Sequence, residues 1–87
     1  MSITFEGGLS GLMPEVALEY LRGIIRSDDT VQAIRLVPVR LSGGLVQEIY
    51  CDSQTGTSRR RVFGFTPVSA RLDVSRGEGE VILRLAS

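Results

Sequence analysis

Apolar and polar side chains alternate most regularly near the end of this chain. Residues 70–75 place an apolar side chain at every second position, and residues 80–85 resume the pattern after a glycine-containing turn. A period of two is typical of a strand that buries one face and exposes the other. The two segments therefore predict an antiparallel hairpin with one apolar face and one charged face.

The middle of the chain predicts a second hairpin. Val31–Leu41 is rich in β-branched residues, and a Ser-Gly-Gly turn at residues 42–44 leads into a strand over Leu45–Cys51. Pro38 lies inside the first of these strands. Since proline donates no hydrogen bond to a ladder, this strand is expected to lie at an edge of the sheet or to carry a bulge.

Two shorter segments complete the predicted strands. Ile3–Glu6 alternates apolar and polar side chains, as a short half-buried strand does. After a polar loop over Asp52–Thr57, a further strand is expected over Arg60–Thr66, and Pro67 ends it.

Residues 14–26 predict one amphipathic helix. Apolar residues recur along this segment at helical spacing, while glutamates and arginines occupy the other face. Pro14 suits the first helical position, and Glu15 suits the positive end of the helix dipole. Gly23 costs about 1 kcal/mol relative to alanine inside a helix, so it is expected to mark a close approach between helix and sheet.

These elements predict a single α+β domain over residues 1–87. A short N-terminal strand precedes one helix, which packs on an antiparallel meander sheet of about five strands. The general shape resembles cystatin-like folds, a resemblance that carries no function by itself.

The inventory of basic residues restricts the chemistry that this chain can perform. It has ten arginines, no lysine and no histidine. Without histidine there is no ordinary general base near neutral pH, and without lysine there is no P-loop or Schiff base. A guanidinium binds anions but does not transfer protons. The chain is therefore expected not to be an enzyme and to hold no cofactor.

Arg59, Arg60 and Arg61 form the candidate binding patch. A strand over these positions would place Arg59 and Arg61 on the same face as Phe63 and Phe65, with Arg60 on the other face. The two phenylalanines are expected in the core, because large aromatics dominate small cores. The arginines would then protect a sheet edge or bind a carboxylate of a partner. The alternative is an exposed aromatic face beside the arginines, which would bind single-stranded nucleic acid.

Residues 61–65 (Arg-Val-Phe-Gly-Phe) resemble part of the RNP1 motif of the RNA-recognition family. Ile3–Leu9 resembles the partner RNP2 strand of that family more loosely. We do not assign the chain to the family. Val62 stands where the motif has glycine, and residues 68–86 predict a hairpin in place of the family's second helix.

Three other features are expected to be structural. The Gly7–Gly11 segment could present backbone N–H groups to an anion, but it lacks the dinucleotide-binding spacing and is expected to be a flexible turn. The acidic residues at Asp28-Asp29 and near residues 73–80 lack the spacing of a calcium loop, so no metal is expected. Cys51, the single cysteine, is expected to be a buried small hydrophobe.

Charge and size favour a protein that acts through its surface. Residues 1–58 carry four arginines against seven acidic residues, and residues 59–87 carry six arginines against three. This asymmetry favours complementary contacts within the fold or between copies of the chain. Arginine is also enriched in interfaces, where lysine is depleted. The leading hypothesis is a structural or assembly subunit that oligomerises or docks into a larger complex, for example a viral or bacterial one.

The second hypothesis is a nucleic-acid-binding module that uses the arginine patch. No membrane partner is expected, because the longest apolar run, around Leu36–Val39, is far too short to span a bilayer. A cytoplasmic location is expected, because one cysteine cannot form an internal disulfide.

Overall fold

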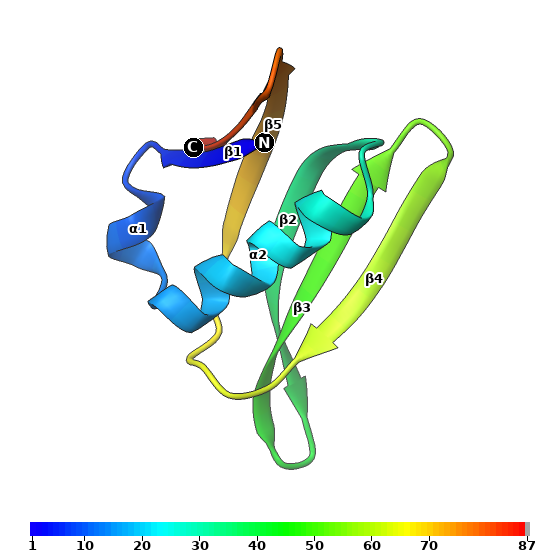
Figure 1. The fold of residues 1–87 in the computed structure, drawn as a ribbon. Coiled ribbons are helices and arrows are strands. Elements are labelled where there is room, and N and C mark those ends of the chain that lie inside the picture. The colour runs from blue at the N-terminus through cyan, green and yellow to red at the C-terminus, as the bar shows by residue number, and fades with distance from the viewer. Residues whose placement is uncertain (87) are drawn as a thin grey trace.

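The computed structural model describes residues 1–86 of the chain. Within this range two helices and six strands follow one another as β1 (Ser2–Glu6), α1 (Leu9–Leu12), α2 (Glu15–Ser27), β2 (Val31–Leu41), β3 (Gly44–Ser53), β4 (Gly56–Val62), β5 (Ala70–Gly77) and β6 (Glu80–Ala86). The strands form one mixed sheet, and α2 lies across one of its faces (Figure 1). The α+β class expected from the sequence is confirmed.

Helix α2 is the helix predicted from the apolar spacing, and it begins and ends one residue later than predicted. Pro14 lies just before it in an extended conformation, in keeping with the preference of proline for helix starts. At the other end the backbone N–H of Asp28 donates to the carbonyl of Ile24 at 3.1 Å. The face that α2 turns to the sheet consists of Ala17, Leu18, Leu21, Ile24 and Ile25.

A second, four-residue helix, α1, lies where the sequence predicted only a glycine-rich turn. Gly7 leaves β1 with φ 78°, and a Cβ added there would lie 3.0 Å from the Cβ of Leu85. Glycine is therefore required at the point where the chain turns away from the sheet. The turn delivers Leu9, the first residue of α1, into the core, where it is fully buried. The single-helix prediction was wrong because one short turn is needed to bring this leucine inward.

The hydrophobic core lies between α2 and the sheet. Alternate side chains of the strands point toward the helix, as the period-two pattern predicted. Each such side chain stabilises the fold by about 1.5–3 kcal/mol when it is fully buried. The strand residues of this core are Val31, Ile34 and Leu36 on β2, Ile49 and Cys51 on β3, Leu72 on β5, and Val81 and Leu83 on β6.

The order of the strands differs from the expected meander. It runs β1-β6-β5-β2-β3-β4, so β5 pairs with β2 instead of β4, and β1 joins the sheet parallel to β6. The physical reason lies in the side chains of β4, which are exposed at every position except the partly buried Val62. Such a strand has little apolar surface to place beneath α2, whereas β5 contributes the fully buried Leu72. β4 is therefore left at an edge of the sheet.

The change of order requires the chain to cross the sheet between β4 and β5. Residues 63–69 pass below the first turn of α2 (Figure 1). Gln47 of β3 holds this segment by two hydrogen bonds: its side-chain amide donates to the carbonyl of Val68 at 3.1 Å and accepts from the N–H of Val68 at 2.8 Å. The buried amide thus acts as a neighbouring strand would, and it satisfies backbone groups that would otherwise be unpaired.

Pro38 lies on a central strand, contrary to the expectation of an edge strand, but on a part of it that β5 does not reach. β5 pairs with β2 only from Ala33 to Leu36, and β2 continues to Leu41. The bulge of β2 lies elsewhere, between Val31 and Ala33. The missing N–H of proline is therefore tolerated because no strand pairs with β2 on the β5 side at this position.

Candidate functional site at the edge strand β4

β4 forms the outer edge of the sheet next to β3. It begins four residues before the predicted strand and ends at Val62, so most of the predicted polar loop is strand as well. Only a two-residue turn separates Ser53 from its partner Gly56. The side-chain hydroxyl of Thr57 donates to Asp52 of β3 at 2.8 Å. Cross-strand polar contacts of this kind replace the apolar pairs that mark most strands in a sequence.

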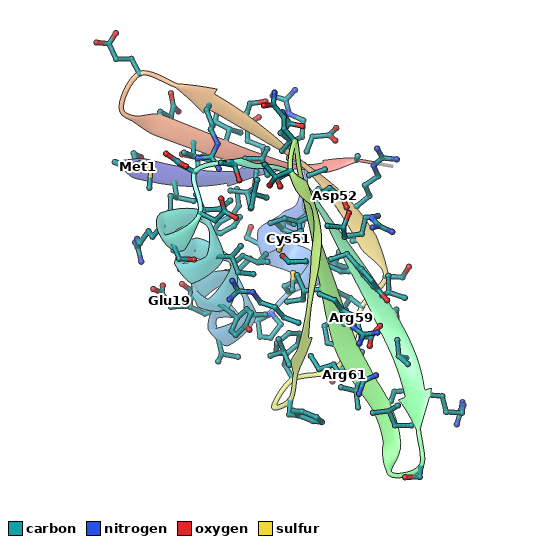
Figure 2. The ribbon with its side chains drawn as sticks, turned by 90° about the vertical axis from the view of Figure 1, so that its right-hand side faces the viewer. Met1, Glu19, Cys51, Asp52, Arg59 and Arg61 are labelled. Atoms are coloured by element: carbon teal, nitrogen blue, oxygen red, sulfur yellow. The ribbon has the colours of Figure 1, made fainter. Side chains whose placement is uncertain are left out.

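Arg59 and Arg61 lie on the sheet face that points away from α2, and both converge on Glu48 of β3. Figure 2 shows them on the opposite side of the sheet from the helix. Arg61 Nε donates to Glu48 Oε2 at 2.8 Å, and Arg59 Nε lies 4.0 Å from the same oxygen. Both arginine side chains are about half exposed, whereas the residue exposure of Glu48 is 3%. The arginines are thus anchored from inside the sheet while their outer nitrogens remain accessible.

Glu48 also receives a hydrogen bond from Tyr50, whose hydroxyl lies 2.7 Å from Oε1. The hydrogen bonds from Arg61 and Tyr50, together with the charge of Arg59, hold the pKa of Glu48 below its usual range. Two hydrogen-bond donors and a neighbouring guanidinium charge keep this covered carboxylate ionised, because each favours the charged form. Glu48 is therefore a fixed negative charge, unsuited to proton transfer near neutral pH.

The same polar network continues along the uncovered face. Arg35 of β2 donates from Nε and Nη2 to the two carboxylate oxygens of Asp52, at 3.0 and 3.1 Å. Its guanidinium carbon also lies 4.8 Å from the ring centroid of Tyr50. The hydrogen bonds from Arg35 and Thr57 lower the pKa of Asp52. Arg35 thus covers the one aromatic ring that the central strands present on this face.

Arg60 points to the other face, toward α2. It lines a groove of about 560 Å³ between β4 and the helix, together with Val16, Glu19, Tyr20, Gly23, Ile24 and Ser27. The expectation that Gly23 marks a close approach was wrong, because a Cβ added there would have nothing within 4 Å. The absent side chain instead leaves the groove open at its middle. Val16, 62% exposed, forms the apolar end of the same groove.

The structure separates the two phenylalanines from the arginine patch. β4 ends at Val62, so Phe63 and Phe65 do not continue its alternation and do not share a strand face with Arg59 and Arg61. Phe63 is 72% exposed, which corrects its assignment to the core. Phe65 packs against the core, as expected. The chain turns between them at Gly64, with φ 107°, which is why the two rings part.

Sequence reasoning missed the residues of β3 that organise this site. Gln47 and Glu48 are the polar residues that the core and the sheet bury most fully. Both stand between apolar residues of β3, one strand before the arginine-rich segment. A buried carboxylate in such a strand requires a cationic partner, and that rule would have predicted that Glu48 pairs with an arginine of a neighbouring strand.

The remaining candidate features have local roles. Gly7 and Gly8 form the turn before α1, and Asp28 Oδ1 accepts hydrogen bonds from the N–H and hydroxyl of Thr30. Cys51 is a buried free thiol whose pKa is raised by burial. Among residues 1–86 no three potential ligands are gathered for a metal ion. Neither helix in this range is long and apolar enough to cross a membrane.

Comparisons with protein-family models, curated proteins and solved structures found no match to this chain.

Proposed function

We propose that this chain is a non-enzymatic docking or assembly subunit that joins a larger complex by binding a partner protein at the edge strand β4. The observation that carries the proposal is the position of the arginine triplet, Arg59 to Arg61, on an edge strand beside an open groove. An edge strand presents unpaired backbone groups to other chains. Arginine forms strong, charge-assisted hydrogen bonds and is enriched in protein interfaces.

A partner other than a second copy is favoured at this edge. Antiparallel pairing of β4 with its own copy, centred on Arg59, would set Arg59 against Arg59 and gather six guanidinium groups in one ribbon. Like charges directly opposite each other destabilise strand pairing. A cytoplasmic location belongs to the same proposal, because the one cysteine is buried as a free thiol and needs no oxidising compartment.

Affinity capture from the source cell tests the proposal with two variants of equal charge. R59A/R60A removes two edge arginines and leaves the contact between Arg61 and Glu48 intact. R40A/R71A removes two exposed arginines elsewhere. We expect wild type and R40A/R71A to retain one and the same partner, and R59A/R60A to lose it. A strictly monomeric native mass without a co-purifying protein, or capture that R59A/R60A leaves unchanged, would contradict the proposal.

Nucleic-acid binding is the second candidate, and the exposure of Phe63 near the arginine triplet is the observation in its favour. It ranks second because Arg35 already covers the Tyr50 ring and Glu48 already holds Arg61. Fluorescence anisotropy with single-stranded RNA and DNA, between about 50 and 200 mM salt, would detect it. Binding that weakens steeply with salt and is reduced in R59A/R60A would support this candidate. Absent or salt-insensitive binding would remove it.

A further inference from the structure

We infer that β4 accepts an extended segment of a partner protein as an added strand, and that this segment carries an acidic, an apolar and an acidic residue at three consecutive positions. The inference rests on the proposed function and names the chemistry of the partner. It follows from three features: the backbone register of β4, the placement of its arginines on both faces of the sheet, and the groove beside α2.

The pairing of β3 with β4 determines which backbone groups point outward. Their hairpin is closed by a two-residue turn between Ser53 and Gly56, and residues that flank such a turn exchange backbone hydrogen bonds. Bonded and non-bonded pairs then alternate along an antiparallel ladder. Gly56, Ser58 and Arg60 therefore direct their N–H and C=O groups to β3. Those of Thr57, Arg59 and Arg61 point away from the sheet, where they match the bonding pattern of another strand.

The other free edges of the sheet are less suited to strand addition. The same alternation, counted from the two-residue turn between Leu41 and Gly44, directs the even-numbered residues of β2 toward β5. Beyond the end of β5 the first such residue is Pro38, which has no N–H to donate. The opposite edge, β1, is five residues long, and a short edge strand limits pairing. β4 has seven residues, none of them proline.

The side chains of β4 specify the acidic positions of the added strand. Residues directly opposite each other on neighbouring strands share a face of the sheet. The partner residues opposite Arg59 and Arg61 would lie on the uncovered face, beside two half-exposed guanidinium groups. Arg61 uses its Nε for Glu48, and the terminal nitrogens of a guanidinium can bind a second carboxylate side by side.

The groove specifies the apolar position. The partner residue opposite Arg60 would lie on the helix side, next to the groove that Val16, Tyr20 and the side-chain-free Gly23 line. The two charged residues that line this groove, Arg60 and Glu19, are of opposite sign, so the apolar lining decides the position. An apolar side chain would bury surface against Val16 and Tyr20. Because the acidic–apolar–acidic pattern is symmetric, it suits either direction of the added strand.

Synthetic peptides test the pattern directly. A labelled peptide of about nine residues, within the usual range of strand lengths, would carry Glu-Leu-Glu at its centre between serines and threonines. A second peptide of identical composition would carry Leu-Glu-Glu. We expect fluorescence anisotropy to show at least about tenfold tighter binding of the first peptide. G23L, which fills the groove, should reduce that preference.

A matched pair of variants separates strand addition from charge alone. R59A and R59P both remove the Arg59 guanidinium, but only the proline also removes an outward N–H, a change that edge strands tolerate. We expect R59P to bind the Glu-Leu-Glu peptide at least about tenfold more weakly than R59A does, while circular dichroism shows both folded. Hydrogen exchange at the amides of Thr57, Arg59 and Arg61 should slow when the peptide is bound to the wild-type protein.

The experiments test strand addition, the partner chemistry and the proposed function separately. Equal binding of the two peptides, or equal binding by R59A and R59P, would overturn strand addition and leave a charge-based docking site at β4. Absence of peptide binding would overturn the inferred partner chemistry. The proposed function itself stands or falls with the capture experiment on R59A/R60A, which does not depend on either peptide.

Discussion

The two faces of the sheet are stabilised by different interactions. Toward α2 the strands present aliphatic side chains, of which Ile34, Ile49 and Leu72 are completely buried. On the opposite face no helix covers the strands within residues 1–86, and ion pairs around Glu48 and Asp52 connect β2, β3 and β4 instead. β3 contributes to both faces, because successive side chains of a strand point in opposite directions.

A charged residue, Glu48, is nearly as buried as the core isoleucines. Glu48 lies on the face without a helix, yet the long side chains of Tyr50, Arg59 and Arg61 converge on it. Because the two arginines match the charge of Glu48, the buried carboxylate needs no further layer of protein over this face. The unpaired hydrogen-bonding groups lie at the edge of the sheet instead, in the outward backbone groups of β4.

The largest expected effect is on the helix-covered face. Leu72→Ala should lower the free energy of unfolding by about 2–5 kcal/mol, because it removes a fully buried side chain and leaves a cavity. Leu45→Ala is the matched control, since Leu45 is 54% exposed on β3, and it should change stability by less than about 0.5 kcal/mol. Urea denaturation measures both. Similar losses for the two variants would mean that the apolar face is not the main source of stability.

The next largest effect concerns residues 63–69, the segment that crosses the sheet between β4 and β5. Gln47→Ala removes both side-chain hydrogen bonds to Val68 and leaves its partly buried N–H and C=O groups unpaired. The fold should lose about 1–3 kcal/mol of stability in total. Gln54→Ala, in the exposed turn before β4, is the control and should have little effect. Hydrogen exchange of the Val68 amide should accelerate in Gln47→Ala alone. Unchanged protection of that amide would show that another group holds the segment.

A smaller and pH-dependent effect is expected on the uncovered face. The pKa of Glu48 is lowered in the folded state by Arg61, Tyr50 and Arg59. Its contribution to stability is therefore present above the unfolded pKa of about 4.3 and is lost as the pH falls through the folded value. Glu48→Gln should be less stable than wild type at neutral pH, and the difference should shrink in acid. Glu78→Gln, in the exposed β5–β6 turn, is the control and should show no such pH-dependent loss of stability. A pH-independent difference between Glu48→Gln and wild type would refute the ion-pair account.

The smallest effect is a gain of stability at the groove. Gly23 is exposed within α2, and a Cβ there contacts nothing within 4 Å. Gly23→Ala should raise the free energy of unfolding by about 0.5–1 kcal/mol, because alanine loses less backbone entropy in a helix. The melting temperature reports the gain. A loss of stability would mean that this side of α2 is more closely packed than the groove implies.

The candidate site could be predicted from the sequence only in part. The triplet Arg59 to Arg61 and the opposite orientation of Arg60 followed from residue type and strand geometry. The extent of strand β4 could not be predicted, because its first half is as polar as a loop. It is recognised as a strand only by its pairing with β3. Phe63 was misplaced for the related reason that the strand was expected to continue past Val62.

The sequence by itself determined the elements whose patterns are local: the helix α2, the hairpin of β2 and β3, and the alternating strands β5 and β6. Hydrophobic spacing predicts which side of an element is buried, and a short turn predicts that the two strands flanking it pair with each other. Neither records which distant element lies alongside. Only the tertiary structure decided that β5 pairs with β2, that β1 runs parallel to β6, and that β4 with its arginines lies at the edge. Those pairings depend on how the apolar faces fit together beneath α2, which is a property of the whole chain.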